Sequence, residues 1–303
     1  MAAVLALLVL SPVCAEYLIG YDSIIGRPWE LASGLFVLAP LYGTVAVLIR
    51  EVARRTGRGW PSILLLSAAF GLFQAGLIDQ SLFNPHFVSD PFWSQERLPT
   101  LVPAAGISAH HLLGFVVGHM IWSFAAPIVV VESCVPRLAD RPWLGRVGTT
   151  VLLVLYALAV VVFFHEHTRN FMRARHNWAP PRLSATHQLA PADWSGSVLD
   201  LTALSLGGCL LLFWSRRRDW DRPHALMVGG TALVVNAALS FVVEPVGGHT
   251  SLTAKYAANA TLMAAVLALL TWAYRRLLHT GARTTTATLP EQRVLTIGGD
   301  GES

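Results

Sequence analysis

Charged residues are scarce in this chain, whose 303 residues are 13% charged and 54% hydrophobic. A typical soluble domain carries about 25% charged residues, which cover its surface. A single soluble core with a solvated exterior is therefore excluded as the whole structure. The excess apolar surface is expected to face lipid.

Cysteine is also rare, and Cys14, Cys134 and Cys209 lie within or beside apolar stretches without CxxC spacing. This arrangement argues against a disulfide framework and a zinc knuckle. The HEH run from His165 to His167 lacks the four-residue histidine spacing of a helical zinc site, and no HExxH, Walker A or GxSxG motif occurs. No metal and no cofactor is predicted. The arginines form no basic face interleaved with aromatics, so nucleic-acid binding is not predicted either.

Long apolar stretches dominate what is present, and a membrane-spanning helix needs about 20 mostly apolar residues. Eight segments approach that length: 2–19, 31–50, 60–79, 108–131, 147–165, 197–214, 224–243 and 253–274. The predicted fold is an all-α polytopic transmembrane helix bundle of about eight spans, with the lipid bilayer as its partner. Residues 1–279 form the predicted bundle, and residues 280–303 are expected to be a disordered cytoplasmic tail.

The first segment, MAAVLALLVLSPVCA, admits two interpretations. As a cleaved signal peptide ending at Ala15, it would leave seven spans in the mature protein. It lacks the basic residues that normally precede the apolar core of such a peptide, so we favour its retention. The orientation of every later span is the same in both cases.

Arginine placement predicts the orientation of the spans, because cytoplasmic loops of membrane proteins are rich in basic residues. Clusters that begin at Arg50, Arg137, Arg216 and Arg275 follow the second, fourth, sixth and eighth spans. The connection between residues 165 and 194 is a basic exception on the other side. Arginine residues greatly outnumber lysine residues, as in proteins encoded by GC-rich bacterial genomes. We therefore expect a bacterial plasma-membrane protein with both termini in the cytoplasm.

Polar side chains inside the spans are the best functional candidates, because a charged group in hydrocarbon costs about 2.5 to 3.5 kcal/mol. The fourth span places His111, His119 and Trp122 within one third of the helix circumference, with His119 near the bilayer midplane. A neutral imidazole there is available as a proton relay, a ligand or a base. A structural hydrogen bond between helices is the commoner role of such a residue.

The third span ends in a polar stretch that contains Gln74, Asp79, Gln80 and Asn84 before Pro85. This stretch is interpreted either as a vestibule for a substrate or ion or as a solvated helix C-terminus. Both interpretations remain open at the level of sequence.

The seventh and eighth spans each align polar residues along one face, and a short connection predicts that these faces meet. Glu244 and Lys255 are expected to form an ion pair near the outer interface. Glu16 in the first span and Asp200 in the sixth lie on the same outer side. Acidic groups from four spans thus approach one membrane level, which predicts an outward-facing cavity.

The runs PLYGTVAVLIREVARRTGRGW and SAAFGLFQAGLIDQSLFNP resemble uncharacterised multi-pass membrane proteins of actinobacteria. The resemblance covers the second to fourth spans. It implies a multi-pass membrane protein and no particular activity.

Three functional hypotheses follow from these patterns. The leading one is a permease-like bundle with an outward-facing polar pocket for a small polar or amphiphilic solute. The alternatives are a membrane-embedded enzyme acting on a lipid or prenyl substrate, and a non-catalytic assembly or sensing subunit. The sequence gives no signal for an oligomeric state. The predicted pocket consists of Glu16, Gln74, Asp79, Gln80, Asn84, His111, His119, Trp122, Asp200, Asn236, Glu244, Lys255 and Asn259.

Overall fold

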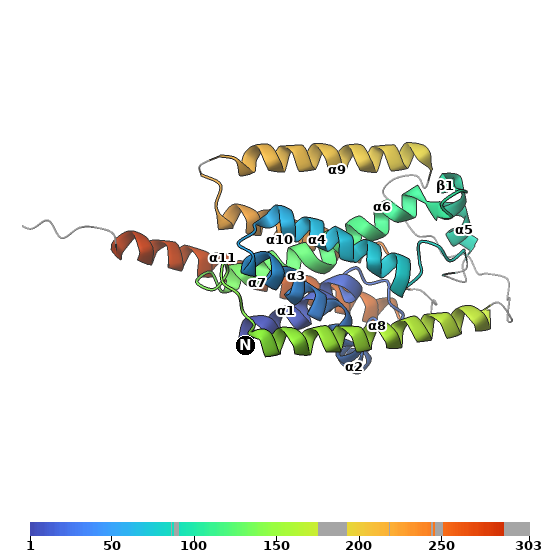
Figure 1. Cartoon of the computed structure of the whole chain (residues 1–303), viewed down its shortest axis with the longest axis horizontal. Coiled ribbons are helices and arrows are strands. Elements are labelled where there is room, and N and C mark those ends of the chain that lie inside the picture. Colours follow the sequence, from blue (N-terminus) through green and yellow to red (C-terminus); the bar gives the residue numbers. More distant parts are fainter. Residues whose placement is uncertain are drawn as a thin grey trace, which may run out of the picture.

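The computed structural model describes residues 1–85, 87, 91–174, 193–217, 219–243, 245 and 251–287. For residues 91–92, 166–174 and 281–287 it describes the backbone alone. Helices dominate this part of the chain and run between two ends of an elongated molecule (Figure 1). The all-α fold class is confirmed.

Each of the first four predicted spans contains a π-helical turn. Their elements are α1 (Ala2–Pro12) with η1 (Val13–Tyr17), α2 (Pro28–Leu38) with η2 (Ala39–Gly43) and α3 (Thr44–Arg55), α4 (Trp60–Phe73) with η3 (Gln74–Ile78), and α6 (Ala109–Gly118) with η5 (His119–Ala125) and α7 (Ala126–Cys134).

The other four predicted spans are uninterrupted helices, namely α8 (Arg146–Ala174), α9 (Trp194–Ser215), α10 (Arg222–Leu239) and α11 (Leu252–Ala287). Helix α11 continues past the predicted bundle boundary at residue 279, and residues 288–303 lie outside the described part. Between η3 and α6 lie α5 (Pro91–Arg97), the 3-10 turn η4 (Leu98–Thr100) and the antiparallel strands β1 (Leu101–Val102) and β2 (Ile107–Ser108).

Six helical segments in the described part are long and apolar enough to cross a membrane. They are Pro28–Arg55, Trp60–Ile78, Ala109–Cys134, Arg146–His165, Trp194–Ser215 and Leu252–Thr280. The apolar segment Ala2–Tyr17 is shorter, and α10 begins with a polar first turn. Six segments therefore meet the length and composition of a span, where the sequence pattern predicts about eight.

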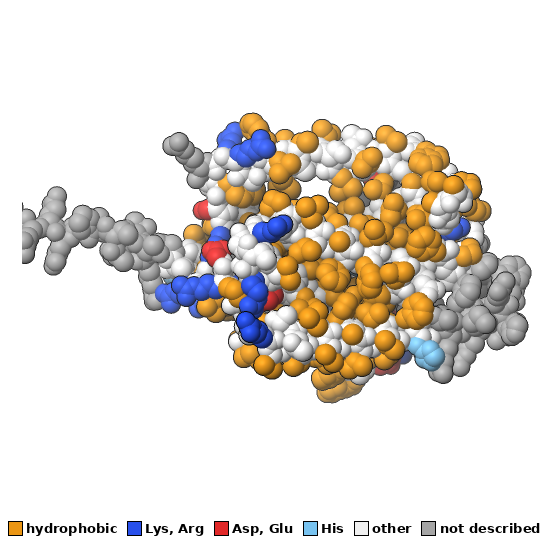
Figure 2. Space-filling view, viewed as in Figure 1, with side chains coloured by type: hydrophobic (Ala, Val, Ile, Leu, Met, Phe, Trp, Pro, Cys, Tyr) orange, Lys and Arg blue, Asp and Glu red, His pale blue; other side chains and the backbone are white. Residues whose placement is uncertain are grey.

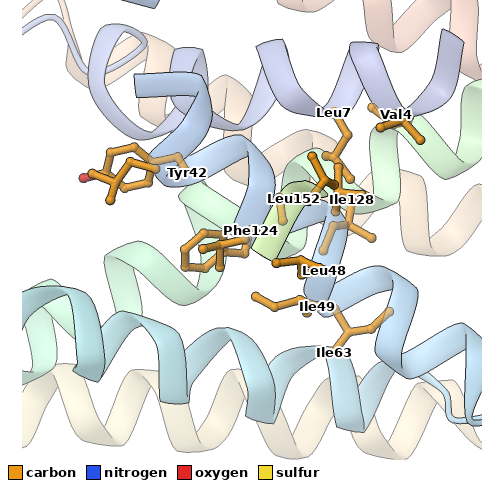
Figure 3. Packing of buried hydrophobic residues seen from close by; sticks show 14 of the residues in the cluster. Val4, Leu7, Tyr42, Leu48, Ile49, Ile63, Phe124, Ile128 and Leu152 are labelled. Carbon is orange, nitrogen blue, oxygen red and sulfur yellow. The ribbon is translucent and has the colours of Figure 1, made fainter. Parts of the chain in front are cut away.

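The apolar core lies between α1, α3, α4, η5 and α7 (Figure 3). Leu7 of α1 and Ile128 of α7 are fully buried there, at 0% exposure. By contrast, only 11% of the span residues of α8 and of α9 are buried, so these two helices lie at the periphery. The first segment thus contributes one face to the core, while Leu5 and Val9 are 57% and 47% exposed.

The close approach of α1 to the second segment requires Gly43. A Cβ atom at this position would lie 2.3 Å from the carbonyl oxygen of Leu8. The Ser11 hydroxyl completes the contact, because it lies 2.6 Å from the carbonyl oxygen of Ser123 and 3.2 Å from that of Tyr42. Helix α1 is therefore hydrogen-bonded to both neighbouring segments deep in the bundle.

Basic side chains gather at one end of the molecule, which we call the basic end (Figure 2). Arg50 is 0% exposed there, and its Nε donates to Glu132 Oε1 over 3.0 Å. Arg54 donates to both oxygens of Glu132 at 2.8 and 2.6 Å. Glu51 pairs with Arg55 at 2.5 Å, in the helix-supporting order that the sequence predicts. This buried network joins α3 to α7.

Candidate functional site

Four π-helical turns carry the central candidate side chains. Glu16 lies in η1, Tyr42 in η2, Gln74 in η3 and His119 in η5. π-Helical residues make up well under 1% of globular proteins, and single π turns are frequent at functional sites. Four of them in one bundle therefore mark this region as the candidate site.

Prolines account for the position of three of these turns, because proline lacks the N–H group that continues an α-helix. Pro12 directly precedes η1, Pro40 lies inside η2, and Pro127 follows η5 at the start of α7. Proline positions thus coincide with interruptions of the α-helical hydrogen-bond pattern in three of the four segments.

Glu16 is held by two tyrosine hydroxyl groups. The Tyr21 hydroxyl donates to Glu16 Oε2, and the Tyr42 hydroxyl hydrogen-bonds to the same carboxylate. In Figure 3 the Tyr42 hydroxyl points away from the labelled apolar side chains, as this contact requires. Tyr21 comes from the connection between η1 and α2, so a loop and two helical segments define the position of this carboxylate.

Asp79 is the second carboxylate of the site and directly follows η3. Its Oδ1 accepts a hydrogen bond of 2.8 Å from Gln74 Nε2. It interacts electrostatically with Glu16 and with Tyr156 of α8. The structure thus brings together Glu16, Gln74 and Asp79, three of the predicted pocket residues.

The carboxylates keep part of their surface accessible, although they lie among packed helices. Glu16 and Asp79 are half-buried, whereas the neighbouring Tyr42 and Gln74 are only 4% and 3% exposed. Side chains that served only as contacts between helices would be dry. Both acids therefore differ from fully buried interhelical contacts, because part of each residue stays accessible.

His119 contributes to the site from η5. Its Nδ1 lies 3.1 Å from Ser123 Oγ, and its ring stacks on Tyr42 with 5.8 Å between centroids. Gly71 of α4 allows the approach, because a Cβ atom there would lie 3.0 Å from the His119 Cβ. His119 is thus connected to Glu16 through Tyr42.

A cavity of about 270 Å³ adjoins the site on the side of α8. It is lined by Gly76, Leu77, Gln80, Phe83, Asn84, Pro85 and Phe164. Gln80 has a φ of 60°, a left-handed conformation that is uncommon for residues with a Cβ atom. Gly76 and Gln80 lie on either side of Asp79 in the chain. The predicted residues Gln80 and Asn84 therefore line a cavity next to the carboxylate pair.

The polar faces of α10 and α11 meet, as the sequence predicts. Asn259 Nδ2 donates to the Ser240 carbonyl oxygen over 2.8 Å, and Asn236 Nδ2 donates to that of Cys14 over 3.2 Å. Asn236 and Asn259 are each 1% exposed, so they act as contacts between helices. Lys255 is 3% exposed and lies over the Tyr256 ring. Its expected partner Glu244 lies outside the described residues.

Three further candidates lie apart from the carboxylate pair. His111 stacks on Trp93 of α5 with 4.2 Å between centroids, two helical turns before His119. Trp122 packs beside Gly118 of its own segment. Asp200 lies on α9, which packs against α6 at the periphery. Helix α9 has its main described contacts with α6 and η4, and neither brings Asp200 beside Glu16 or Asp79.

Sequence reasoning missed Tyr21, Tyr42 and Tyr156. A tyrosine inside an apolar span is itself a signal, because its hydroxyl needs a hydrogen-bond partner when buried. Among the described residues, no three His, Cys, Asp or Glu side chains are grouped as metal ligands would be.

A model of an uncharacterized membrane protein family matches residues 5–174, more than half of the chain. The chain belongs to this family. Searches of curated proteins and of solved structures gave no match. The family region includes the second to fourth spans on which the resemblance above rests. It also contains Glu16, Tyr42, Asp79 and His119, so the whole site lies within the part of the chain that defines this membrane protein family.

Proposed function

We propose that this membrane protein is permease-like and binds a small polar solute between Glu16, Tyr42, Gln74, Asp79 and His119. The observation that carries the proposal is the pair of half-buried carboxylates, Glu16 and Asp79, inside the helical bundle. Acidic groups at membrane depth are costly, and where they occur they usually mark a substrate or ion pathway. The dry contacts of Asn236 and Asn259 differ from this pair and suit a structural role.

The proposed pocket opens to the outside of the cell. Cytoplasmic loops are rich in basic residues, so the basic end is assigned to the cytoplasm, with both termini there. Glu16 lies on the order of 20 Å along the first segment from Ala2, which starts near that end, at about 1.5 Å per residue. The network of Arg50, Arg54 and Glu132 closes the cytoplasmic side. This arrangement corresponds to an outward-open state, and transport requires the network to rearrange.

Glu16→Gln tests the proposal, because it removes the charge and keeps the size. Its matched control is Glu30→Gln, at a glutamate on α2 that pairs with Arg27 and is 48% exposed. A deletion strain is complemented with wild type or either variant and compared by untargeted metabolite and lipid profiling. We expect Glu30→Gln to restore the wild-type profile and Glu16→Gln to restore none of the solutes that deletion changes.

Proteoliposomes then show whether a solute found in this way crosses the membrane. Uptake by wild type and Glu30→Gln, without uptake by Glu16→Gln, supports a permease. Chemical conversion of the compound without uptake would replace the proposal by membrane-embedded catalysis. A Glu16→Gln protein that inserts normally and restores the full profile would refute the role of this site.

A further inference from the structure

The cavity between η3 and α8 opens sideways. Leu77, Phe83 and Phe164 line it and are 57%, 48% and 47% exposed, respectively. Leu77 and Phe164 belong to segments that are long and apolar enough to span the membrane. Exposed apolar side chains of such segments face acyl chains. The mouth of the cavity is therefore accessible from lipid.

The same cavity lies next to Asp79 in the chain. Gly76 and Gln80 line it, and Asp79 between them is hydrogen-bonded to Gln74 and feels the charge of Glu16. On the opposite wall, α8 contributes Phe164 to the cavity and Tyr156 to the electrostatic surroundings of Asp79. One helix and one turn thus border both an apolar cavity and an acidic site.

The charges at this junction favour a cation. Among the described residues, the charged side chains with an electrostatic effect on Glu16 and Asp79 are acidic: Glu16 affects Asp79, and Asp22 affects Glu16. Gln74, Tyr21 and Tyr42 add neutral hydrogen-bonding groups. A protonated amine is a hydrogen-bond donor with the charge that this set lacks.

We propose that the ligand is an amphiphile dissolved in the membrane, with its protonated amine at Asp79 and Glu16 and its chain in the cavity beside Leu77, Phe83 and Phe164. It enters laterally from the bilayer. The inference rests on the proposed function, because it uses the same carboxylates, and it adds the chemical class of the solute.

The headgroup, and not the tail, must provide the selectivity. Acyl chains in the bilayer are as apolar as leucine, so moving a tail from lipid into the cavity gains little free energy. A charge-assisted hydrogen bond to a carboxylate is worth about 1.5 to 3 kcal/mol. Occupancy should therefore depend on the amine and only weakly on chain length.

The experiment uses purified full-length protein in phosphatidylcholine nanodiscs and two photoreactive probes. One is a long-chain primary amine with a diazirine in its tail, and the other is the alcohol with the same tail. After illumination, labelled residues are identified by mass spectrometry. We expect the amine to label the cavity about tenfold more than the alcohol does. Both probes should label the remaining lipid-facing surface equally.

Two substitutions separate the head from the tail. Asp79→Asn changes the charge without changing the size and should remove the excess labelling by the amine. Gly76→Phe should fill the cavity and lose the cavity label. Gly114→Ala in α6, where no atom lies within 4 Å of the Cβ position, is the control and should label as wild type. Asp79→Asn keeps the test decisive if Gly76→Phe does not fold.

Equal labelling of the cavity by both probes, or excess labelling that survives Asp79→Asn, would overturn the amphiphile proposal. Ethylamine, which has the amine without a tail, then shows whether the solute site survives. Binding of ethylamine to wild type but not to Asp79→Asn, measured by calorimetry, would leave the proposed function in place with a tail-free solute. Profiling with Glu16→Gln, which requires no amine, decides the proposed function separately.

Discussion

The Tyr42 ring stacks on the imidazole of His119, with 5.8 Å between centroids and 30° between the ring planes. The hydroxyl of the same tyrosine bonds to the Glu16 carboxylate. One side chain from η2 therefore links an acid in η1 to a histidine in η5. Because both contacts start from Tyr42, they can be removed separately by mutation.

Tyr42→Phe keeps the stacked ring and removes the hydroxyl. A hydrogen bond to a charged group contributes about 1.5 to 3 kcal/mol, so solute uptake should fall about tenfold if this bond positions Glu16 for binding. The loss of thermal stability in detergent should be small, about 1 kcal/mol. Tyr274→Phe, at a tyrosine of α11 that is 42% exposed, is the control and should leave uptake unchanged.

His119→Ala removes the ring and its contact with Ser123. We expect this variant to accumulate in the membrane but not to restore the wild-type metabolite profile. The site loses the imidazole that bonds to Ser123 and stacks on Tyr42. His111→Ala, at the histidine that stacks on Trp93, is the matched comparison. Wild-type behaviour of His119→Ala in every assay that detects the parent's activity would remove His119 from the site.

Gly43→Ala should destabilise the bundle. The new Cβ would lie 2.3 Å from the Leu8 carbonyl oxygen, and overpacking of this kind costs about 1 to 3 kcal/mol. Gly114→Ala in α6 is the control, since no atom lies within 4 Å of its Cβ position and alanine favours a helix by about 1 kcal/mol over glycine. Unfolding in detergent measures both. A Gly43→Ala protein as stable as Gly114→Ala would contradict the close packing of α1.

Apolar length in the sequence predicted the helices. Such signals are local, and each of the eight predicted segments is helical because a stretch in lipid must satisfy its own backbone. The number of spans does not follow from apolar content alone, because the first segment is apolar but shorter than the six candidate spans.

The site was predictable only in part. Gln74 and Asp79 lie five residues apart, so their proximity is a local property. The contact of Tyr42 with Glu16 joins two segments, and a helical wheel for one segment cannot show it. The peripheral place of Asp200 on α9 likewise depends on which helices are neighbours. Periodicity therefore identified polar residues at membrane depth, while packing decided which of them meet.

The start of α9 should depend on pH through Asp193. Its side chain accepts hydrogen bonds from the Ser195 hydroxyl and the Gly196 N–H, and these bonds hold the pKa of Asp193 below its ordinary value. A carboxyl with a lower pKa in the folded state stabilises that state above its unfolded pKa of about 3.9. This contribution is lost as the pH falls through the lower, folded pKa.

Hydrogen exchange at the first turn of α9 should therefore quicken relative to α7 as the medium is acidified below about pH 4, after correction for the intrinsic exchange rate. Asp193→Asn keeps a capping oxygen and removes the titration. In that variant the extra acid-induced exchange should disappear. If the variant and wild type respond equally to acid, Asp193 is not the responsible group.

Glu132→Gln should be among the most destabilising single changes at the basic end. Its carboxylate neutralises Arg50, which is fully buried, and binds Arg54 through two hydrogen bonds. Removal of one partner of a buried ion pair costs about 3 to 5 kcal/mol. Glu51 remains 3.7 Å from Arg50, so the loss should lie near the lower end of this range. The exposed Arg27–Glu30 pair contributes only about 0 to 1 kcal/mol, so Glu30→Gln is the matched control.

Thermal unfolding in detergent should show a large difference between the two variants. Equal stabilities would mean that the Arg50–Glu132–Arg54 network does not hold α3 against α7, and the closed cytoplasmic side inferred from it would be lost as well.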